Sequence, residues 1–552
     1  MTSSLAIVNA DLRTMEPGGP RQQAIFVSGD RVAAVGSTEE IKALCTVDTR
    51  VVDAEGATVL PGFVESHMHL FFGAYSLKVL RLEAITGTAA LTRAIQEFAA
   101  QNPDYNLLVA QGLAYASFDG GQNPDRHILD AICPDRPLLL QSADFHNGWA
   151  NTAALQAADV LRGRDLGPGS HIELDADGMA TGTLIEPPAV ATIQARGPHG
   201  GREVLGLEGV EPAQEVTQAQ READKALMRE GLKYCAQHGI TTIINMDGNL
   251  YQASLLQEIE AEGDLCCRLE LPYHFTPGEP VENIEIAEQM RRKLDSPMLW
   301  CNRVKFFMDG TLDAHTGYRV RDYPDTAGHK SAPLHDPARF SDLAVELDKR
   351  GFQIAVHAIG DGAVRAVLDG YEAARSANGP QGNRHRIEHI ELLDPADRPR
   401  FAALDVVASF MPPHPPGCGD FPLEPLASII GRDQWPDAYT WRTLKETGAR
   451  VCFSSDWPIA ALPPLTGIDI ALTRQVWDAD QKDERLSFED TLAAYTSEGA
   501  YACRRDDHFG RLAPGLLADI VVLDRMLTDS NAGDTAIAAT ICNGVVTYLA
   551  TD

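Results

Sequence analysis

Strand-like and helix-like segments alternate through most of this chain, and the alternation limits the folds open to it. Helical patterns, such as those at 222–239 and 342–351, separate most of the apolar stretches of strand length. Such a pattern favours a parallel sheet with helical crossovers, and eight repeats close a barrel. We therefore predict an α/β fold with a (β/α)8 TIM barrel, whose strands are 62–69, 239–247, 267–275, 303–310, 352–360, 384–392, 405–413 and 449–458.

The two ends of the chain have a different pattern. Both contain short runs of alternating apolar and polar residues, with a hairpin signal at Asn543-Gly544. We expect the ends to meet in one small sheet domain. The stretch between the first and second barrel strands is too long for a single crossover, so it predicts an insert that shapes the substrate pocket. The predicted domains are 1–60 plus 508–552 for the sheet domain, 61–72 plus 221–507 for the barrel, and 73–220 for the insert.

Two histidines end the first predicted strand, in "VLPGFVESHMHL". Side chains alternate faces along a strand, so His67 and His69 point the same way, roughly 7 Å apart. Two such imidazoles can hold one metal ion. Alternatively, one is a packed core histidine and the other is exposed.

Other strands carry further metal-capable residues. His357, His389 and Asp456 lie at or near the C-terminal ends of their strands, where barrels of this class carry their chemistry. His385 shares a strand face with His389, but His389 follows the apolar run and is nearer the rim, so we prefer it. Asp456 ends an apolar strand, where an unpaired carboxylate would be costly to bury.

Lys305 lies in the middle of the fourth strand. A buried lysine is costly unless it loses its charge. A neutral amine can react with carbon dioxide to give a carbamate, a bidentate anion able to bridge two metal ions. The alternative is an ion pair between Lys305 and Asp309.

Composition excludes some classes of partner. The 552 residues have a formal net charge of −31, which argues against nucleic acid, because a phosphate backbone requires a basic footprint. We see no signal peptide and no apolar stretch long enough to span a membrane. Ten scattered cysteines without a C-x-x-C motif predict reduced thiols in a cytoplasmic protein.

Five motifs taken together resemble the amidohydrolase superfamily: "PGFVESHMH", "VKFFMDG", "VHAIGDGAV", "HRIEHIELL" and "SSDWP". The chain is most similar to the large YtcJ-like branch (amidohydrolase family 3), which includes N-substituted formamide deformylase. The similarity runs over nearly the whole chain and implies that the terminal segments form a β-sandwich. One departure is Glu65, where many members carry aspartate.

The resemblance implies a metal-dependent hydrolase that cleaves a non-peptide C–N bond in an amide or N-substituted formamide. His67, His69 and Asp456 would hold one Zn2+, His357 and His389 a second, and carboxylated Lys305 would bridge them, although other divalent metals stay open. A metal-bound hydroxide would attack, and Asp456 would act as general base and then acid. We also expect His146, from the insert, to contact the substrate, although it is equally an ordinary loop histidine.

Several alternatives stay open. A mononuclear deaminase of an aminated heterocycle shares the fold, an esterase or lactonase shares the site, and a non-catalytic binding protein would lack the chemistry. Residues 410–425, with His414 and several prolines, predict a stiff rim loop whose role the sequence leaves open. We expect an apolar N-substituted amide as the small-molecule substrate, and a homo-oligomer is left open.

Overall fold

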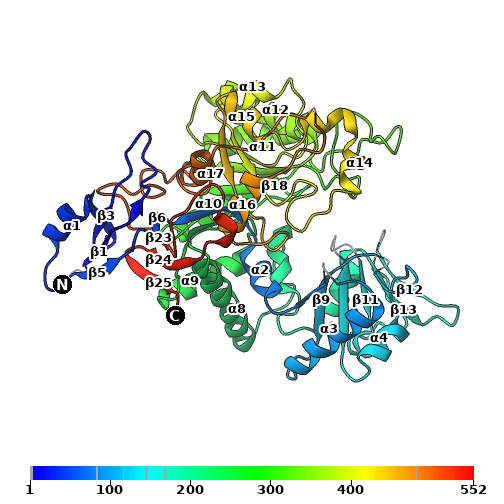
Figure 1. Cartoon of the computed structure of the whole chain (residues 1–552). Helices are drawn as coiled ribbons and strands as arrows, with labels where there is room; N and C mark the ends of the chain where they lie inside the picture. The colour runs from blue at the N-terminus through cyan, green and yellow to red at the C-terminus, as the bar shows by residue number, and fades with distance from the viewer. Residues whose placement is uncertain are drawn as a thin grey trace. The chain divides into compact units, whose positions relative to one another are not determined.

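The computed structural model describes residues 4–82, 85–115, 117–142, 147–166, 170–479 and 481–551. The chain divides into two compact units (Figure 1). The larger unit contains Met1–Leu70, Gly206–Glu211 and Arg229–Asp552, and the smaller contains Phe71–Leu205 and Pro212–Met228.

The larger unit has a strand at each of the eight predicted positions, so the predicted α/β alternation is confirmed. Two parallel sheets hold these strands, in the orders β17-β15-β14-β7 and β16-β18-β19-β20-β21-β22. The predicted stretch 267–275 is split into β15 and β16, one in each sheet. The strand bounds are β7 Phe63–Met68, β14 Ile240–Asn245, β15 Arg268–Glu270, β16 Tyr273–His274, β17 Leu299–Trp300, β18 Arg303–Phe307, β19 Gln353–Ala358, β20 Arg386–His389, β21 Val407–Phe410 and β22 Arg450–Phe453.

Helices between these strands bury one apolar face each. Helix α11 (Pro337–Lys349) begins after Asp336, whose carboxylate accepts from Arg339 N. It packs on α12 (Asp361–Asn378), and a Cβ at Gly370 of α12 would lie 2.6 Å from the Phe340 ring. A glycine at this position therefore lets the two helices approach closely.

The two ends of the chain meet in one five-stranded sheet of order β2-β6-β23-β24-β25. Strand β6 pairs antiparallel with β23, and β6 runs almost directly into β7. A four-stranded sheet of order β4-β3-β1-β5 packs its apolar residues into the same core cluster. The bounds are β1 Ser4–Val8, β2 Asp11–Leu12, β3 Ala24–Ser28, β4 Arg31–Gly36, β5 Arg50–Asp53, β6 Thr58–Pro61, β23 Ile520–Leu523, β24 Ile537–Cys542 and β25 Val545–Leu549.

The smaller unit contains its own six-stranded sheet, of order β12-β13-β11-β10-β9-β8. Helices α3 (Thr88–Gln101) and α4 (Arg126–Ile132) contribute Leu91, Ile95 and Leu129 to a separate apolar core. The strand bounds are β8 Leu80–Arg81, β9 Leu108–Leu113, β10 Leu138–Ser142, β11 Asn147–Ala150, β12 His171–Leu174 and β13 Ala180–Ile185. No helix in the described part of the chain is long and apolar enough to cross a membrane.

A buried ion pair joins the parallel sheet to the terminal strands. Arg268 of β15 donates from Nε and Nη2 to the two oxygens of Asp519, at 2.7 and 3.1 Å, next to β23. Its Nη2 also donates to Asn543 Oδ1 at 2.9 Å. Both charged side chains are almost fully buried, so each depends on the other to offset its lost hydration.

We expect Arg268→Ala to destabilise the protein by about 3–5 kcal/mol, because it leaves the Asp519 carboxylate buried and unpaired. The measurement is the urea midpoint of the larger unit. Arg442→Ala is the matched control, since it breaks an exposed pair with Glu446 and should cost at most about 1 kcal/mol. Equal shifts for the two variants would contradict the prediction.

Candidate active site

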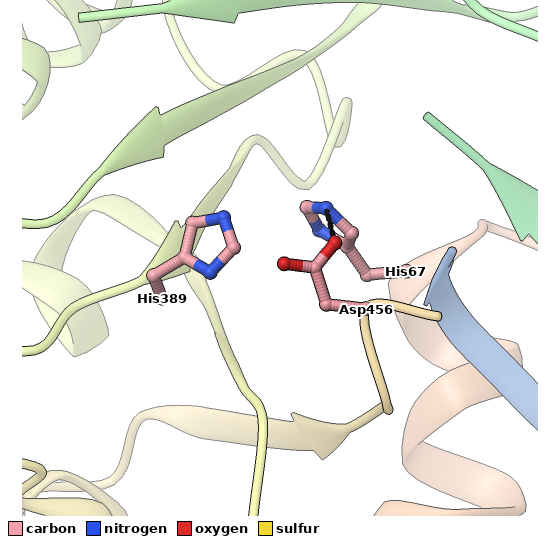
Figure 2. A group of neighbouring side chains, drawn as sticks. All are labelled: His67, His389 and Asp456. Atoms are coloured by element: carbon pink, nitrogen blue, oxygen red, sulfur yellow. Dashed lines mark ion pairs between the residues drawn. The ribbon is translucent and has the colours of Figure 1, made fainter. Parts of the chain in front are cut away.

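Residues from the beginning, middle and end of the larger unit meet at the carboxyl ends of the parallel strands. Figure 2 shows His67, His389 and Asp456 facing one another. One ligand atom from each lies within 4.8 Å of the others, and all three side chains are buried. The Asp456 backbone N–H donates to His67 O at 2.9 Å, which fixes the end of β22 against the end of β7.

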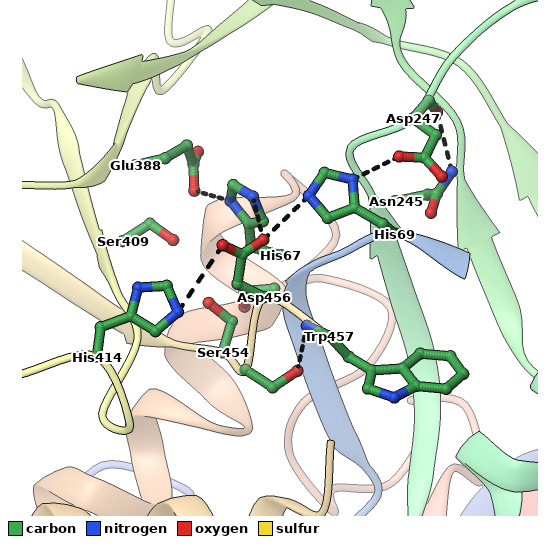
Figure 3. Close-up of polar contacts among 12 residues, drawn as sticks. His67, His69, Asn245, Asp247, Glu388, Ser409, His414, Ser454, Asp456 and Trp457 are labelled. Atoms are coloured by element: carbon green, nitrogen blue, oxygen red, sulfur yellow. Dashed lines mark hydrogen bonds and ion pairs between the residues drawn. The ribbon is translucent and has the colours of Figure 1, made fainter. Parts of the chain in front are cut away.

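One oxygen of Asp456 faces His67 of β7 and His69, which directly follows this strand. Its Oδ1 lies 3.2 Å from His67 Nε2 and 3.0 Å from His69 Nε2 (Figure 3), and no donor in the described part of the chain is aligned with it for a hydrogen bond. Burial alone would raise the pKa of Asp456, but the neighbouring His67 outweighs it and holds the pKa well below its usual range. The group is therefore a buried carboxylate anion with three imidazoles around it.

Two further carboxylates bond to the Nδ1 atoms of His67 and His69 and so orient the two rings. His67 Nδ1 is hydrogen-bonded to Glu388 Oε2 at 2.8 Å, and His69 Nδ1 is hydrogen-bonded to Asp247. Arg386 donates to both oxygens of Glu388, and although burial raises the pKa of a carboxyl, this guanidinium holds the pKa of Glu388 well below its usual range. With each Nδ1 used in this way, each Nε2 is left to face Asp456.

His357 and His389 form the other side of the cluster. Their ring centroids lie 4.5 Å apart, and that of His389 lies 5.0 Å from that of His67. Burial lowers the pKa of His357 to about 3 and the pKa of His389 well below its usual range, so both rings are neutral and able to act as ligands. The buried His389 Nδ1 has no hydrogen-bond partner within the residues that the structure describes. His389 and Asp456 both have positive φ, +76° and +62°, a strained backbone that is typical of functional sites.

Lys305 is fully buried in β18, and its Nζ has no hydrogen-bond partner among the described residues. Burial lowers its pKa to about 8. The alternative pairing with Asp309 is not formed, because Asp309 accepts hydrogen bonds from the backbone N–H groups of Ile359, Gly360 and Tyr318. The centroid of the Phe307 ring lies 4.8 Å from Lys305 Nζ.

His385 stands apart from the cluster. His385 Nδ1 accepts from Ile354 N at 3.1 Å, its Nε2 is hydrogen-bonded to Asp348 Oδ1 at 3.1 Å, and its ring stacks on Tyr371. These bonds use both of its nitrogens, whereas His389 lies in the cluster. His146 lies outside the described residues.

Several side chains that hold the cluster residues in place were not predicted from the sequence. Glu388 directly precedes His389, and Asp247 closes the second predicted strand, but neither has a sequence pattern that indicates its partner. Glu65, noted as a departure, accepts from Ser455 N at 2.8 Å and so anchors the residue before Asp456. His414 lies with its Nε2 3.8 Å from Asp456 Oδ2.

The cluster has the donor set of a metal centre. Imidazole nitrogens and a carboxylate oxygen converge from separate parts of the chain, and two of these atoms, His389 Nδ1 and Asp456 Oδ1, have no hydrogen bond to any described residue. Nitrogen and carboxylate ligands of this kind suit zinc best, and a metal-activated water suits hydrolysis.

Comparison with known proteins gives consistent matches. A family model described as "Amidohydrolase family" matches residues 50–548. The putative amidohydrolase YtcJ of Bacillus subtilis is 28% identical, over 97% of both chains. The N-substituted formamide deformylase of Arthrobacter pascens is 27% identical, over 99% of this chain and 98% of its own. An uncharacterized metal-dependent hydrolase from Pyrococcus horikoshii OT3 has a similar structure, with a TM-score of 0.75 at 22% identity, over 96% of this chain and 98% of its own.

We expect the stability of the metal-free protein to fall as the pH rises from about 6.5 to 9. Burial would lower the pKa of His69, but Asp247 and Asp456 outweigh it and raise the pKa to about 9. The stability that comes from the protonated ring is complete below the unfolded pKa of about 6.5 and is lost as the pH passes through the folded pKa. Urea midpoints across this range, in the presence of a chelator, measure the effect.

The matched variant for this titration is Asp247→Asn. It keeps the shape of the side chain but removes one of the two carboxylates that raise the pKa of His69. Its urea midpoint should therefore depend less steeply on pH over the same range, while Glu65, whose pKa burial raises to about 8, contributes equally to both proteins. Parallel curves for the two proteins would contradict this assignment.

Proposed function

Because this chain belongs to the amidohydrolase family, we propose that it is a metal-dependent hydrolase of carbon–nitrogen bonds that acts on amides or N-substituted formamides. The observation that carries the proposal is the buried Asp456 carboxylate, whose Oδ1 lies against two imidazole nitrogens and is aligned with no hydrogen-bond donor among the described residues. A buried anion needs a positive partner, which protonated His69 supplies in the metal-free protein; a bound metal ion would take that part, with the imidazoles as its ligands.

We assign the ligands as two sets. His67, His69 and Asp456 would hold one ion, and His357 and His389 a second, with carboxylated Lys305 as the bridge. The unpartnered atoms Lys305 Nζ and His389 Nδ1 support this assignment, because buried polar atoms normally have partners. Zn2+ fits the donors best, and other divalent ions could replace it.

Lys305 has the surroundings that carbamate formation requires. Its amine is fully buried, and burial lowers its pKa to about 8, so a sizeable fraction is neutral near neutral pH. The neutral amine attacks carbon dioxide, forms an N–C bond and releases one proton, which gives a carbamate anion. That negative charge would lie at the ends of β18 and β19, beside His357.

Different residues of this chain would carry out different parts of the reaction. When bound, the metal ions would lower the pKa of a water molecule and polarise the scissile carbonyl. Asp456 would take the proton from this water and deliver it to the leaving amine, as general base and then acid. Glu388 and Asp247 hold His67 and His69 in the orientation that this geometry needs. His146 remains our second catalytic candidate, on the sequence argument alone.

Our proposal for the substrate class rests on one relative and on one aromatic side chain beside the site. The Arthrobacter pascens relative is named for its action on N-substituted formamides. The half-buried ring of Phe307 lies 4.7 Å from the His357 ring, so it presents an apolar surface beside the reacting atoms. We infer an amide with an apolar N-substituent. A deaminase with one metal would leave Lys305 buried without a role, while an esterase or lactonase would use the same residues.

We also propose how the chain is divided into a barrel, a β-sandwich and an insert. The parallel strands from β7 to β22 would close into one (β/α)8 barrel, since the Asp456 N–H bond to His67 O already joins its two ends. The terminal segments 1–60 and 508–552 would form a β-sandwich, 61–72 plus 221–507 the barrel, and 73–220 the insert. All ten cysteines are free, which suits a reducing cytoplasm.

The first test is turnover. Zinc-loaded protein should release amine from N-alkyl or N-benzyl formamides faster than it hydrolyses esters, lactones or aminated heterocycles of similar size. Metal analysis should give two equivalents per chain. Deamination with one equivalent of metal, or no hydrolysis of any C–N substrate, would contradict the proposed function.

We expect Lys305→Ala to lose at least one equivalent of metal and nearly all turnover, because the bridging anion is gone. Lys293→Ala is the matched control, because this lysine lies at the exposed end of α10 (Ile284–Lys293). Removing carbon dioxide and bicarbonate during metal loading should reproduce the loss in the wild type. A Lys305→Ala variant with both metals and full turnover would contradict the bridging role.

Asp247→Asn should weaken Zn2+ binding by about 10–100-fold, since the amide no longer holds His69 as a carboxylate does. Asp348→Asn is the matched control, because Asp348 is bonded to His385, outside the cluster. Competition with a zinc chelator measures both affinities. Equal affinities for the two variants would contradict the orienting role of Asp247.

A further inference from the structure

We propose that His414 is a catalytic residue of this site, whose Nε2–H donates a hydrogen bond to the substrate's carbonyl oxygen as negative charge develops there. The inference rests on the proposed function, because it concerns the same reaction. The evidence is the position of this ring, its unpartnered nitrogen and the loop that holds it.

The two oxygens of Asp456 face different groups. Oδ1 faces His67 and His69, while Oδ2 faces His414 Nε2 at 3.8 Å (Figure 3). The His414 ring lies parallel to that of His389, with centroids 5.8 Å apart and planes inclined by 7°. His414 therefore borders the side of the carboxylate that the ligand histidines of β7 leave open.

The nitrogen that faces Asp456 has no partner. A separation of 3.8 Å is too long for a hydrogen bond, and His414 Nε2 is buried without any other acceptor in the described part of the chain. Nδ1 has its own polar neighbour, Glu391 Oε1, at 3.9 Å. A buried nitrogen left unpaired in the resting protein costs free energy, which a substrate oxygen at this position would offset.

The reaction places a carbonyl oxygen at this position. The water that Asp456 deprotonates lies within hydrogen-bond distance of that carboxylate, and the carbonyl carbon lies about 3–3.5 Å from the water. The carbonyl oxygen is about 1.2 Å from its carbon. A donor that faces Asp456 Oδ2 from the His389 side can therefore reach this oxygen as the C=O bond becomes a C–O single bond.

The loop that carries His414 is held rigidly. Residues 411–416, "MPPHPP", are all buried and follow β21 directly. His414 N donates to Met411 O at 3.0 Å, and Trp477 Nε1 donates to Pro416 O at 2.8 Å. The four prolines restrict the backbone on both sides of the histidine. A donor fixed in advance is what stabilises a developing charge, because no reorganisation is needed during the reaction.

The competing interpretation is that His414 only packs on His389. The test compares zinc-loaded, full-length His414→Phe, which keeps a ring but loses the N–H, with His414→Gln, whose amide can place an N–H near the Nε2 position. Phe421→Leu is the matched control, because this ring also packs against His414, with centroids 5.3 Å apart, and donates nothing. Melting temperature and zinc content are recorded for each protein.

For hydrolysis of an N-alkyl formamide, His414→Phe should lower kcat by about 10²–10³-fold with KM changed less than about threefold. His414→Gln should recover kcat to within about tenfold of the wild type. A second readout is calorimetric binding of methylphosphonate, whose charged oxygens imitate the developing anion. His414→Phe should weaken this binding about tenfold or more, and Phe421→Leu should leave it unchanged.

Each contrary outcome identifies what is wrong. If His414→Phe retains kcat and methylphosphonate affinity, or if it and His414→Gln lose kcat equally while keeping their zinc, His414 is not the donor. Loss of zinc in both variants would show a packing role and would also overturn the inference. A wild type that binds metal but hydrolyses no C–N bond would instead contradict the proposed function, and methylphosphonate binding would still test the donor.

Discussion

The rest of the site depends on the burial of one carboxylate among imidazoles. Asp456 is shielded from water, so its charge must be balanced by groups that the fold brings to it. Its nearest neighbours come from β7 and β20, strands far from β22 in sequence, and they meet only because parallel strands present their carboxyl ends at one edge. The strained backbone at Asp456 and His389 shows that local conformational preference yields to this requirement.

A second row of buried charges lies behind the first. Arg386 holds Glu388, Glu388 holds His67, and His67 faces Asp456, so a continuous series of polar contacts runs through the interior. Arg303 of β18 and Glu270 of β15 form a further buried pair between the two parallel sheets. Replacing either member of such a pair leaves the other buried without a partner, so the substitution is costly even though the intact pair adds little net stability.

The sequence predicted the strands and the cluster residues because both follow simple periodicities. An alternation of two places His67 and His69 on one face, and the end of an apolar run marks the position of Asp456. The same alternation could not separate His385 from His389, since both share a face. The position of His389 nearer the rim favoured it, and the contacts of His385 with Asp348 and Tyr371 in the structure place His385 outside the cluster. Asp247 and Glu388 were missed because their partners are 178 and 321 residues away, and no local pattern encodes such a contact.

The pairing of β6 with β23 has a consequence for biosynthesis. Residues 58–61 leave the ribosome long before residues 520–523, and β6 leads directly into the strand that carries His67. An edge of β6 therefore stays without its neighbour while the residues between the two strands are translated. Completion of the sheet must wait for β23, so a nascent protein stalled before residue 520 would expose an unpaired, apolar strand edge to chaperones and to aggregation.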